Sequence, residues 1–193
     1  MIKINKTIEI NKLVIEYDEY SDSPREWDNL GYFITVDKSH YSPDDNTNLI
    51  NIVKETGDIA TSQEEHIKLI TKAINETDEK VLAIYPIVKY QHGNVLYKLG
   101  TEHGFDCSNN GFYIVTDKTQ KNIGTSPEDF EKAINNELET YNKWINGEVY
   151  CFTLYDENGD VEDSCGGFYS LEDIKDYLSD EWKNEDLSEY IKY

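Results

Sequence analysis

Alternating and β-branched runs of hydrophobic residues predict the strands of this chain. Up to residue 117 they occupy five stretches, 7–18, 31–37, 81–90, 94–98 and 111–117, and a hairpin follows later. The stretches between them are polar or rich in Gly, Pro and Asn, which is typical of loops. We therefore expect short strands that are joined by turns.

Apolar residues at helical spacing predict three helices. Ser62 caps the first, over 62–76, and Glu65 completes a capping box. The second begins after Ser126 and ends at Gly147. Both helices have one apolar face, so each must pack against another element.

The third helix begins at Ser170 and extends its apolar stripe to Trp182, and a short helix over 185–192 is expected after it. Together the elements predict an α+β fold with a largely antiparallel sheet and about three helices packed on one face. Trp144 and Trp182 should then be largely inside. The length of 193 residues suits a single acidic α+β domain over 1–193.

The dipeptide Asn158-Gly159 is typical of a two-residue hairpin turn between 148–156 and 160–165. This turn places Phe152 opposite Cys165, so that Cys151 and Cys165 point to opposite faces of the sheet. The only other cysteine is Cys107. We expect three free thiols, which fits a reducing compartment.

Composition adds an unusual charge to this picture. The chain has 39 Asp and Glu against 18 Lys and Arg, a formal net charge of −21. Arg25 is its only arginine, which argues against direct binding of nucleic acid, because the guanidinium is the usual fork for phosphate. The charge favours a basic partner, and solubility alone is the alternative explanation.

The acidic residues concentrate after residue 155, where thirteen carboxylates stand against three lysines and give a formal charge of −10. Helical spacing puts Asp173, Asp176 and Asp180 on one face of the third helix, where charges repeat every ~5–6 Å, close to the spacing of phosphates along a nucleic-acid strand. We expect one acidic surface for partner binding, made of six residues: Glu157, Asp160, Glu162, Asp173, Asp176 and Asp180.

A second candidate is the loop with the sequence SPREWDN, which holds Arg25, Trp27 and Asp28. As an ordered loop, it would pair Arg25 with Glu26 or Asp28 and put Trp27 into the core. As a recognition loop, it would present Trp27 as an anchor for a partner.

Candidate chemistry is sparse. His92, His103 and Cys107 are ligand types for zinc, and a metal-dependent hydrolase built on them is one alternative function, but their spacing matches no compact zinc motif. We find no nucleophile elbow and no phosphate-binding glycine loop, and we expect no cofactor.

We also find no targeting signal in the pattern of hydrophobic and polar residues. No apolar run reaches the ~18–20 residues of a membrane span, and the first residues lack the apolar core of a secretory signal. We expect a cytoplasmic protein that does not interact with membranes.

Five segments, 23–31 (SPREWDNLG), 111–116, 139–141, 147–150 and 163–169 (DSCGGFY), resemble in order a family of small proteins of unknown function encoded by bacteriophages and prophages. The resemblance implies a viral setting. With the charge, it suggests an acidic inhibitor of a restriction or CRISPR effector that imitates nucleic acid. A phage structural or assembly accessory protein is the other alternative.

Overall fold

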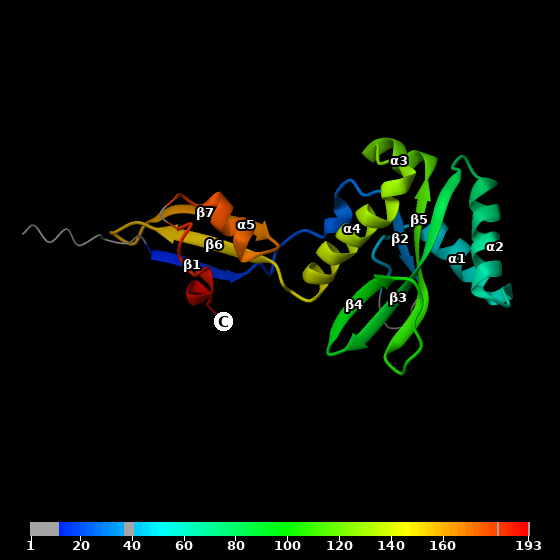
Figure 1. Cartoon of the computed structure of the whole chain (residues 1–193), viewed down its shortest axis with the longest axis horizontal. Helices are drawn as coiled ribbons and strands as arrows, with labels where there is room; N and C mark the ends of the chain where they lie inside the picture. The colour runs from blue at the N-terminus through cyan, green and yellow to red at the C-terminus, as the bar shows by residue number, and fades with distance from the viewer. Residues whose placement is uncertain (1–11, 37–40, 181, 193) are drawn as a thin grey trace, which may run out of the picture. The chain divides into compact units, whose positions relative to one another are not determined.

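The structure, a computed structural model, describes residues 12–36, 41–180 and 182–192 (Figure 1). The first five residues of the strand predicted over 7–18 therefore lie outside the described residues. Contacts group the chain into two compact units: Met1–Asp22 with Lys143–Tyr193, and Ser23–Asn142. The single domain expected over 1–193 is thus composed of two units, the second inserted between two parts of the first. The predicted α+β class is confirmed.

The first unit is a three-stranded antiparallel sheet in the order β1–β6–β7 (Figure 1). Its strands are β1 (Lys12–Tyr17), β6 (Tyr150–Tyr155) and β7 (Val161–Phe168). The helix α5 (Leu171–Tyr177) and the 3-10 helix η3 (Leu187–Tyr190) pack on one face. Ile15, Phe152 and Ile174 meet in the core between them, where each is at most 1% exposed. This unit therefore has a hydrophobic core of its own.

The hairpin of β6 and β7 pairs Phe152 with Cys165 as predicted, but its ladder shifts register on both sides of Phe152–Leu154, and its turn differs in length. The loop holds three residues, because the backbone N–H of Asp156 donates to the carbonyl of Asp160 at 2.9 Å. Gly159, the last residue of this loop, has a left-handed φ of 87°, which is the usual conformation at this position of a three-residue hairpin loop. The prediction of a two-residue turn is therefore wrong. The expected free thiols are confirmed for all three cysteines.

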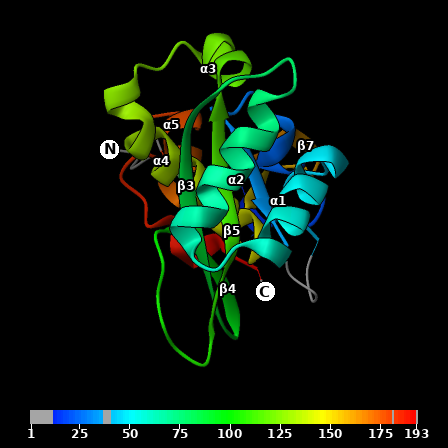
Figure 2. The same ribbon diagram turned by 90° about the vertical axis from the view of Figure 1, so that its right-hand side faces the viewer.

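The second unit is a four-stranded antiparallel sheet in the order β2–β5–β3–β4. Its strands are β2 (Tyr32–Thr35), β3 (Val81–His92), β4 (Asn94–Leu99) and β5 (Cys107–Thr116). Helices α1 (Thr47–Ile59) and α2 (Gln63–Asn75) lie across one face, as Figure 2 shows. On the other face α4 (Phe130–Ile145) packs Tyr141 against Phe33, with ring centroids 5.5 Å apart.

The expectation that the helices share one face of one sheet is wrong. Two sheets form, and the second has helices on both faces because its strands are apolar on both sides. Ile34 and Phe112 face α1 and α2, whereas Phe33 and Tyr113, their chain neighbours, face the other way. A strand that is apolar on both sides has to be covered on both sides.

Individual helix ends test the capping predictions. The Ser62 hydroxyl accepts the N–H of Glu65 at 3.2 Å, as expected, but the Glu65 carboxylate bonds Thr61 instead of closing the capping box. Ser126 does not cap the next helix, because its hydroxyl bonds the Asp129 carboxylate, and a 3-10 turn over Pro127–Asp129 precedes α4.

Two helices are absent from the prediction, α1 and the short α3 (Asp117–Ile123). In α1 only Leu49, Val53 and Thr56 are buried, so its apolar stripe is too thin to recognise from spacing. Asn46 caps this helix with a 3.2 Å bond from the N–H of Leu49.

The third predicted helix is shorter than its apolar stripe. It begins after Ser170, whose hydroxyl accepts the N–H of Asp173 at 3.1 Å, but it ends at Tyr177. Trp182 is buried beyond the helix end, as expected, whereas Trp144 is only half-buried. The helix predicted over 185–192 is reduced to the single turn of η3.

Candidate functional site

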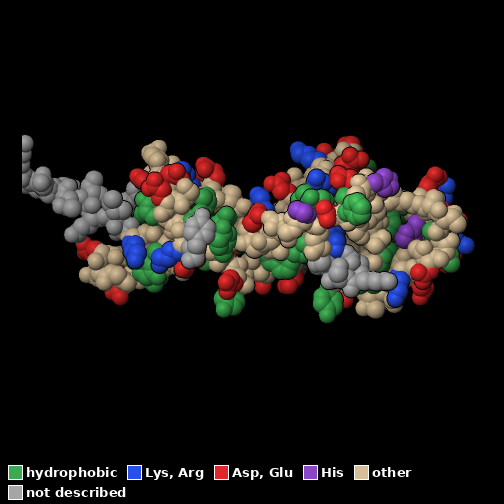
Figure 3. Space-filling model, turned by 90° about the horizontal axis from the view of Figure 1, so that it is seen from below, with side chains coloured by type: hydrophobic (Ala, Val, Ile, Leu, Met, Phe, Trp, Pro, Cys, Tyr) green, Lys and Arg blue, Asp and Glu red, His purple; other side chains and the backbone are tan. Residues whose placement is uncertain are grey.

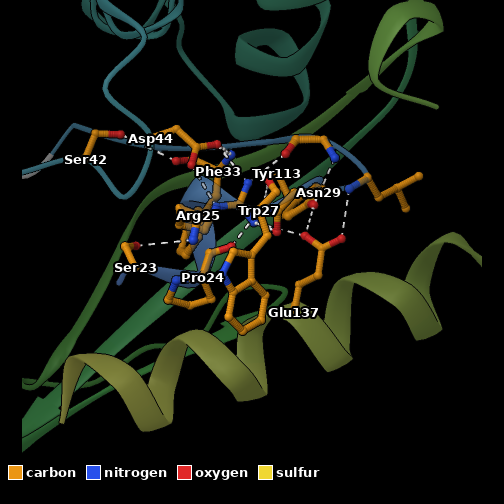
Figure 4. A network of polar contacts seen from close by, with 12 residues as sticks. Ser23, Pro24, Arg25, Trp27, Asn29, Phe33, Ser42, Asp44, Tyr113 and Glu137 are labelled. Carbon is orange, nitrogen blue, oxygen red and sulfur yellow. Dashed lines mark hydrogen bonds and ion pairs between the residues drawn. The ribbon is translucent and has the colours of Figure 1, made fainter. Parts of the chain in front are cut away.

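The most tightly organised polar cluster of the second unit centres on Arg25 (Figure 4). The 3-10 helix η1 (Pro24–Glu26) begins with Pro24, and Ser23 accepts the Arg25 N–H at 3.2 Å. This turn points the guanidinium into the unit, where the side chain is only 5% exposed. Arg25 is therefore a buried charge that needs partners for every N–H.

All five N–H groups of the Arg25 guanidinium have an acceptor. Two of them fork onto the Asp44 carboxylate at 2.7 and 2.8 Å. The other three reach Asn29 at 2.9 Å, Glu137 at 2.9 Å and the Gly31 carbonyl at 2.7 Å. A fully satisfied fork of this kind is the geometry in which arginine can be buried.

The acceptors are themselves held by the backbone of the same loop and by β5. Glu137, on α4, accepts the Leu30 N–H at 2.8 Å and bonds the Tyr113 hydroxyl. That hydroxyl accepts the Gly31 N–H at 2.9 Å. The network thus ties the loop to β5 and to α4, and it fixes the loop's conformation.

Burial affects the pKa values of Arg25 and Tyr113 in this cluster. Burial disfavours the charged guanidinium, but the hydrogen bonds and the charge of Asp44 outweigh it and raise the pKa of Arg25. Burial raises the pKa of Tyr113 as well, and the charge of Glu137 adds to it. Arg25 therefore stays a cation and Tyr113 stays neutral at physiological pH.

The structure corrects the predicted pairing of this loop. Arg25 pairs with Asp44 and Glu137, not with Glu26 or Asp28. The reason is geometric, because η1 turns the guanidinium inward while Glu26 and Asp28 stay at the surface. Arg25 cannot serve as a recognition residue, since each of its donors is used inside the unit.

Trp27 and Asp28 lie on the outer side of the same loop. Trp27 is 54% exposed, so it does not plug the core, and Asp28 is exposed. In Figure 4 the indole ring extends away from the guanidinium of Arg25. An open hollow of about 510 Å³ adjoins this loop, and Asp45 and Asn122 also line it. The loop therefore presents an aromatic ring and a carboxylate from a fixed base.

The six residues of the predicted acidic surface all lie in the first unit, and all are exposed. Asp173 and Asp176 share a face of α5, as predicted. Asp180 does not, because α5 ends at Tyr177, and its carboxylate pairs with Lys183 at 2.9 Å. That hydrogen bond and the charge of Lys183 lower the pKa of Asp180. The predicted row of three on one helix is therefore wrong.

The hairpin residues of this surface lie partly in the loop and partly on a strand. Glu157 and Asp160 belong to the loop, and Glu162 lies on β7. The ladder shifts register between Leu154, which stands opposite Asp163, and Tyr155, which stands opposite Val161, so Glu162 lies at an irregularity of the ladder. In the view of Figure 3, carboxylates are visible on each unit, with lysines among them.

The residues of the metal hypothesis lie at the end of the β3–β5 ribbon. His92 is 3.4 Å from Asp106, and Cys107 Sγ is 4.0 Å from a carboxylate oxygen of Glu102. His103 lines a hollow of about 440 Å³. Within the described residues, no three His, Cys, Asp or Glu side chains gather as a metal site would require.

His66 lines that hollow and a second one of about 660 Å³. Its Nε2 lies 2.8 Å from the carbonyl oxygen of Val53, and its ring meets Phe112 edge to face. These contacts join α2 to α1 and to the sheet. His66 therefore acts in packing, a role that its isolated position in the sequence did not indicate.

None of the helices in the described ranges combines the length and the apolarity that crossing a lipid bilayer requires. Comparison of the chain with protein-family models, with curated proteins and with solved structures found no match. The resemblance to phage proteins therefore stays a prediction. The candidate sites rest on geometry and charge alone.

Proposed function

We propose that this chain is an acidic binding protein that acts by binding to the positively charged surface of a protein partner. The observation that carries the proposal is the C-terminal segment from Asp156 onward, with thirteen carboxylates against three lysines. Asp160, Asp173 and Asp176 are exposed, so a partner can contact their charged groups. A net charge of −21 costs stability through self-repulsion, and a basic partner would relieve that cost.

The partner class follows from complementarity. Proteins that bind nucleic acid carry basic grooves, and an acidic chain steers toward such grooves at long range. With the phage-like segments, this points to a nucleic-acid-binding host protein such as a restriction or CRISPR effector in the cytoplasm. The chain would compete with nucleic acid for the groove. It does not need a regular row of phosphate-like charges to do so.

The test is expression of the protein in strains that carry defined restriction or CRISPR systems, followed by capture of its partner and measurement of affinity against salt. We expect interference to fall in at least one strain, and affinity to drop steeply as ionic strength rises. If interference is unchanged across the panel, the inhibitor proposal is wrong. Capture of phage virion proteins instead of host proteins would favour an assembly role.

A charge-matched pair of variants locates the surface. Asp173→Lys with Asp176→Lys reverses two charges on α5, and Glu55→Lys with Glu128→Lys reverses two exposed charges of the second unit. Both double variants change the net charge equally. We expect the α5 variant to weaken binding more and to lower the salt dependence. Equal losses would mean that only the total charge matters.

A further inference from the structure

The hollow beside Trp27 brings an exposed aromatic ring and exposed carboxylates together in one concave surface. It has a volume of about 510 Å³ and lies entirely within the second unit. Its lining includes an exposed indole and three exposed carboxylates: Trp27, Glu26, Asp28 and Asp45. This arrangement offers a flat aromatic face and negative charge to one and the same occupant.

The charge of this hollow is negative although Arg25 is among the residues that line it. The guanidinium of Arg25 donates all five N–H groups inward, and Asp44 and Glu137 offset its charge. Arg25 is the only Lys or Arg among the described residues that line the hollow. Among the described residues of the lining, an occupant therefore meets three exposed carboxylates and no exposed cation.

Hydrogen bonds within the unit hold the base of the hollow. The Asn29 side chain donates to the carbonyls of Pro24 and Trp27 at 3.1 and 2.7 Å, and Glu137 holds the N–H of Leu30. Because the backbone on both sides of Trp27 is fixed in this way, binding would cost little ordering of the loop.

We propose that this hollow binds an arginine side chain of the basic partner, so the inference rests on the proposed function and gives it a specific anchor. A guanidinium is planar and weakly hydrated, so it stacks on an indole face while its N–H fork reaches carboxylates at the edge. Trp27 supplies the face, and Asp28 and Asp45 supply the acceptors. An ammonium group uses the charge but forms no planar stack, so lysine is the weaker occupant.

The first experiment is an NMR titration of the full chain with acetyl-arginine amide, acetyl-lysine amide and acetyl-citrulline amide. Citrulline keeps the planar shape without the charge. We expect saturable shifts of the Trp27 indole N–H and of the amides of Asp28 and Asp45 with the arginine compound, and weaker ones with lysine. The indoles of Trp144 and Trp182 serve as internal references. Equal shifts with citrulline, or shifts spread over carboxylates of both units, would overturn the inference.

The second experiment separates this inference from the proposed function. Trp27→Ala leaves the net charge at −21. We expect it to weaken binding of the captured partner about tenfold with an unchanged salt dependence, because cation–π contacts contribute in this range. Tyr20→Ala, at a tyrosine of the first unit that is 92% exposed, is the matched control and should have no effect.

The outcomes of the two experiments are distinguishable. If partner capture fails while the arginine titration saturates at Trp27, the hollow is a cation site and the proposed function is wrong. If the partner binds in a salt-dependent way but Trp27→Ala binds as tightly as the natural chain, the hollow is not the anchor.

Discussion

Arg25 and Asp44 form a two-pronged ion pair inside the second unit, with Nε 2.7 Å from Oδ1 and the second prong at 2.8 Å. The pair joins η1 to the turn that precedes α1, across nineteen positions of sequence. Asp44 also accepts the N–H of Phe33 at 2.6 Å. The same carboxylate therefore holds the arginine and the start of β2.

Removal of Arg25 should strongly destabilise the second unit. Arg25→Ala leaves the carboxylates of Asp44 and Glu137 without their cation, and breaking a buried pair costs about 3–5 kcal/mol. Arg25→Lys should lose much of the same free energy of unfolding, because an ammonium group cannot form the two parallel hydrogen bonds to the Asp44 carboxylate. Chemical denaturation measures the free energy of unfolding. Lys68→Ala, which breaks an exposed ion pair with Glu64, is the control and should change little.

Gly31 should tolerate no side chain. A Cβ at this position would lie 2.4 Å from the Ile114 carbonyl oxygen and 2.7 Å from the Tyr113 ring. We expect Gly31→Ala to lower the free energy of unfolding by about 1–3 kcal/mol through overpacking. At Gly104 the nearest atom would be Cys107 Sγ at 3.4 Å, an ordinary contact, so Gly104→Ala should change stability by less than about 0.5 kcal/mol. Similar losses for both variants would contradict the close approach.

The carboxylate of Asp156 should order the hairpin loop. One of its oxygens accepts the N–H groups of Asn158 and Asp160 at 2.9 and 2.8 Å. In Asp156→Ala both amides should exchange with solvent faster, whereas Asp156→Asn keeps an acceptor and much of the protection. Amide hydrogen exchange by NMR measures this. Unchanged exchange in Asp156→Ala would show that the backbone alone holds the turn.

Stability should fall at alkaline pH, in part through Tyr32. Burial and the neighbouring charge of Glu79 raise the pKa of Tyr32 from 10.0 to about 12. Between these values the folded chain binds more protons than the unfolded chain, so the free energy of unfolding decreases as pH rises. Tyr32→Phe should flatten that decrease between pH 10 and 12 in denaturation experiments. An identical slope in the variant would show that Tyr32 does not contribute.

Local signals in the sequence determined several elements correctly. Ser62 and Ser170 mark the starts of α2 and α5 because a cap depends on residues three positions apart. The expected pairing of Phe152 with Cys165 is present although the predicted two-residue turn is not, because the register shift between Leu154 and Tyr155 offsets the longer loop. The acidic charge is likewise a property of composition. These features need no knowledge of distant contacts.

Only the tertiary structure decided the partners of Arg25 and the layering of the second unit. Glu137 lies 112 positions from Arg25, and a chain with so many carboxylates gives no reason to prefer that one over Glu26 or Asp28. The thin apolar stripe of α1 was recognisable only once Ile34 and Phe112 supplied the surface that it covers. Asp180 does not continue the helical row of Asp173 and Asp176, because α5 ends at Tyr177 and the next residue, Leu178, is buried in the core. In each case the outcome depends on which surfaces meet, and a pattern read along the chain holds no information about contacts between distant segments.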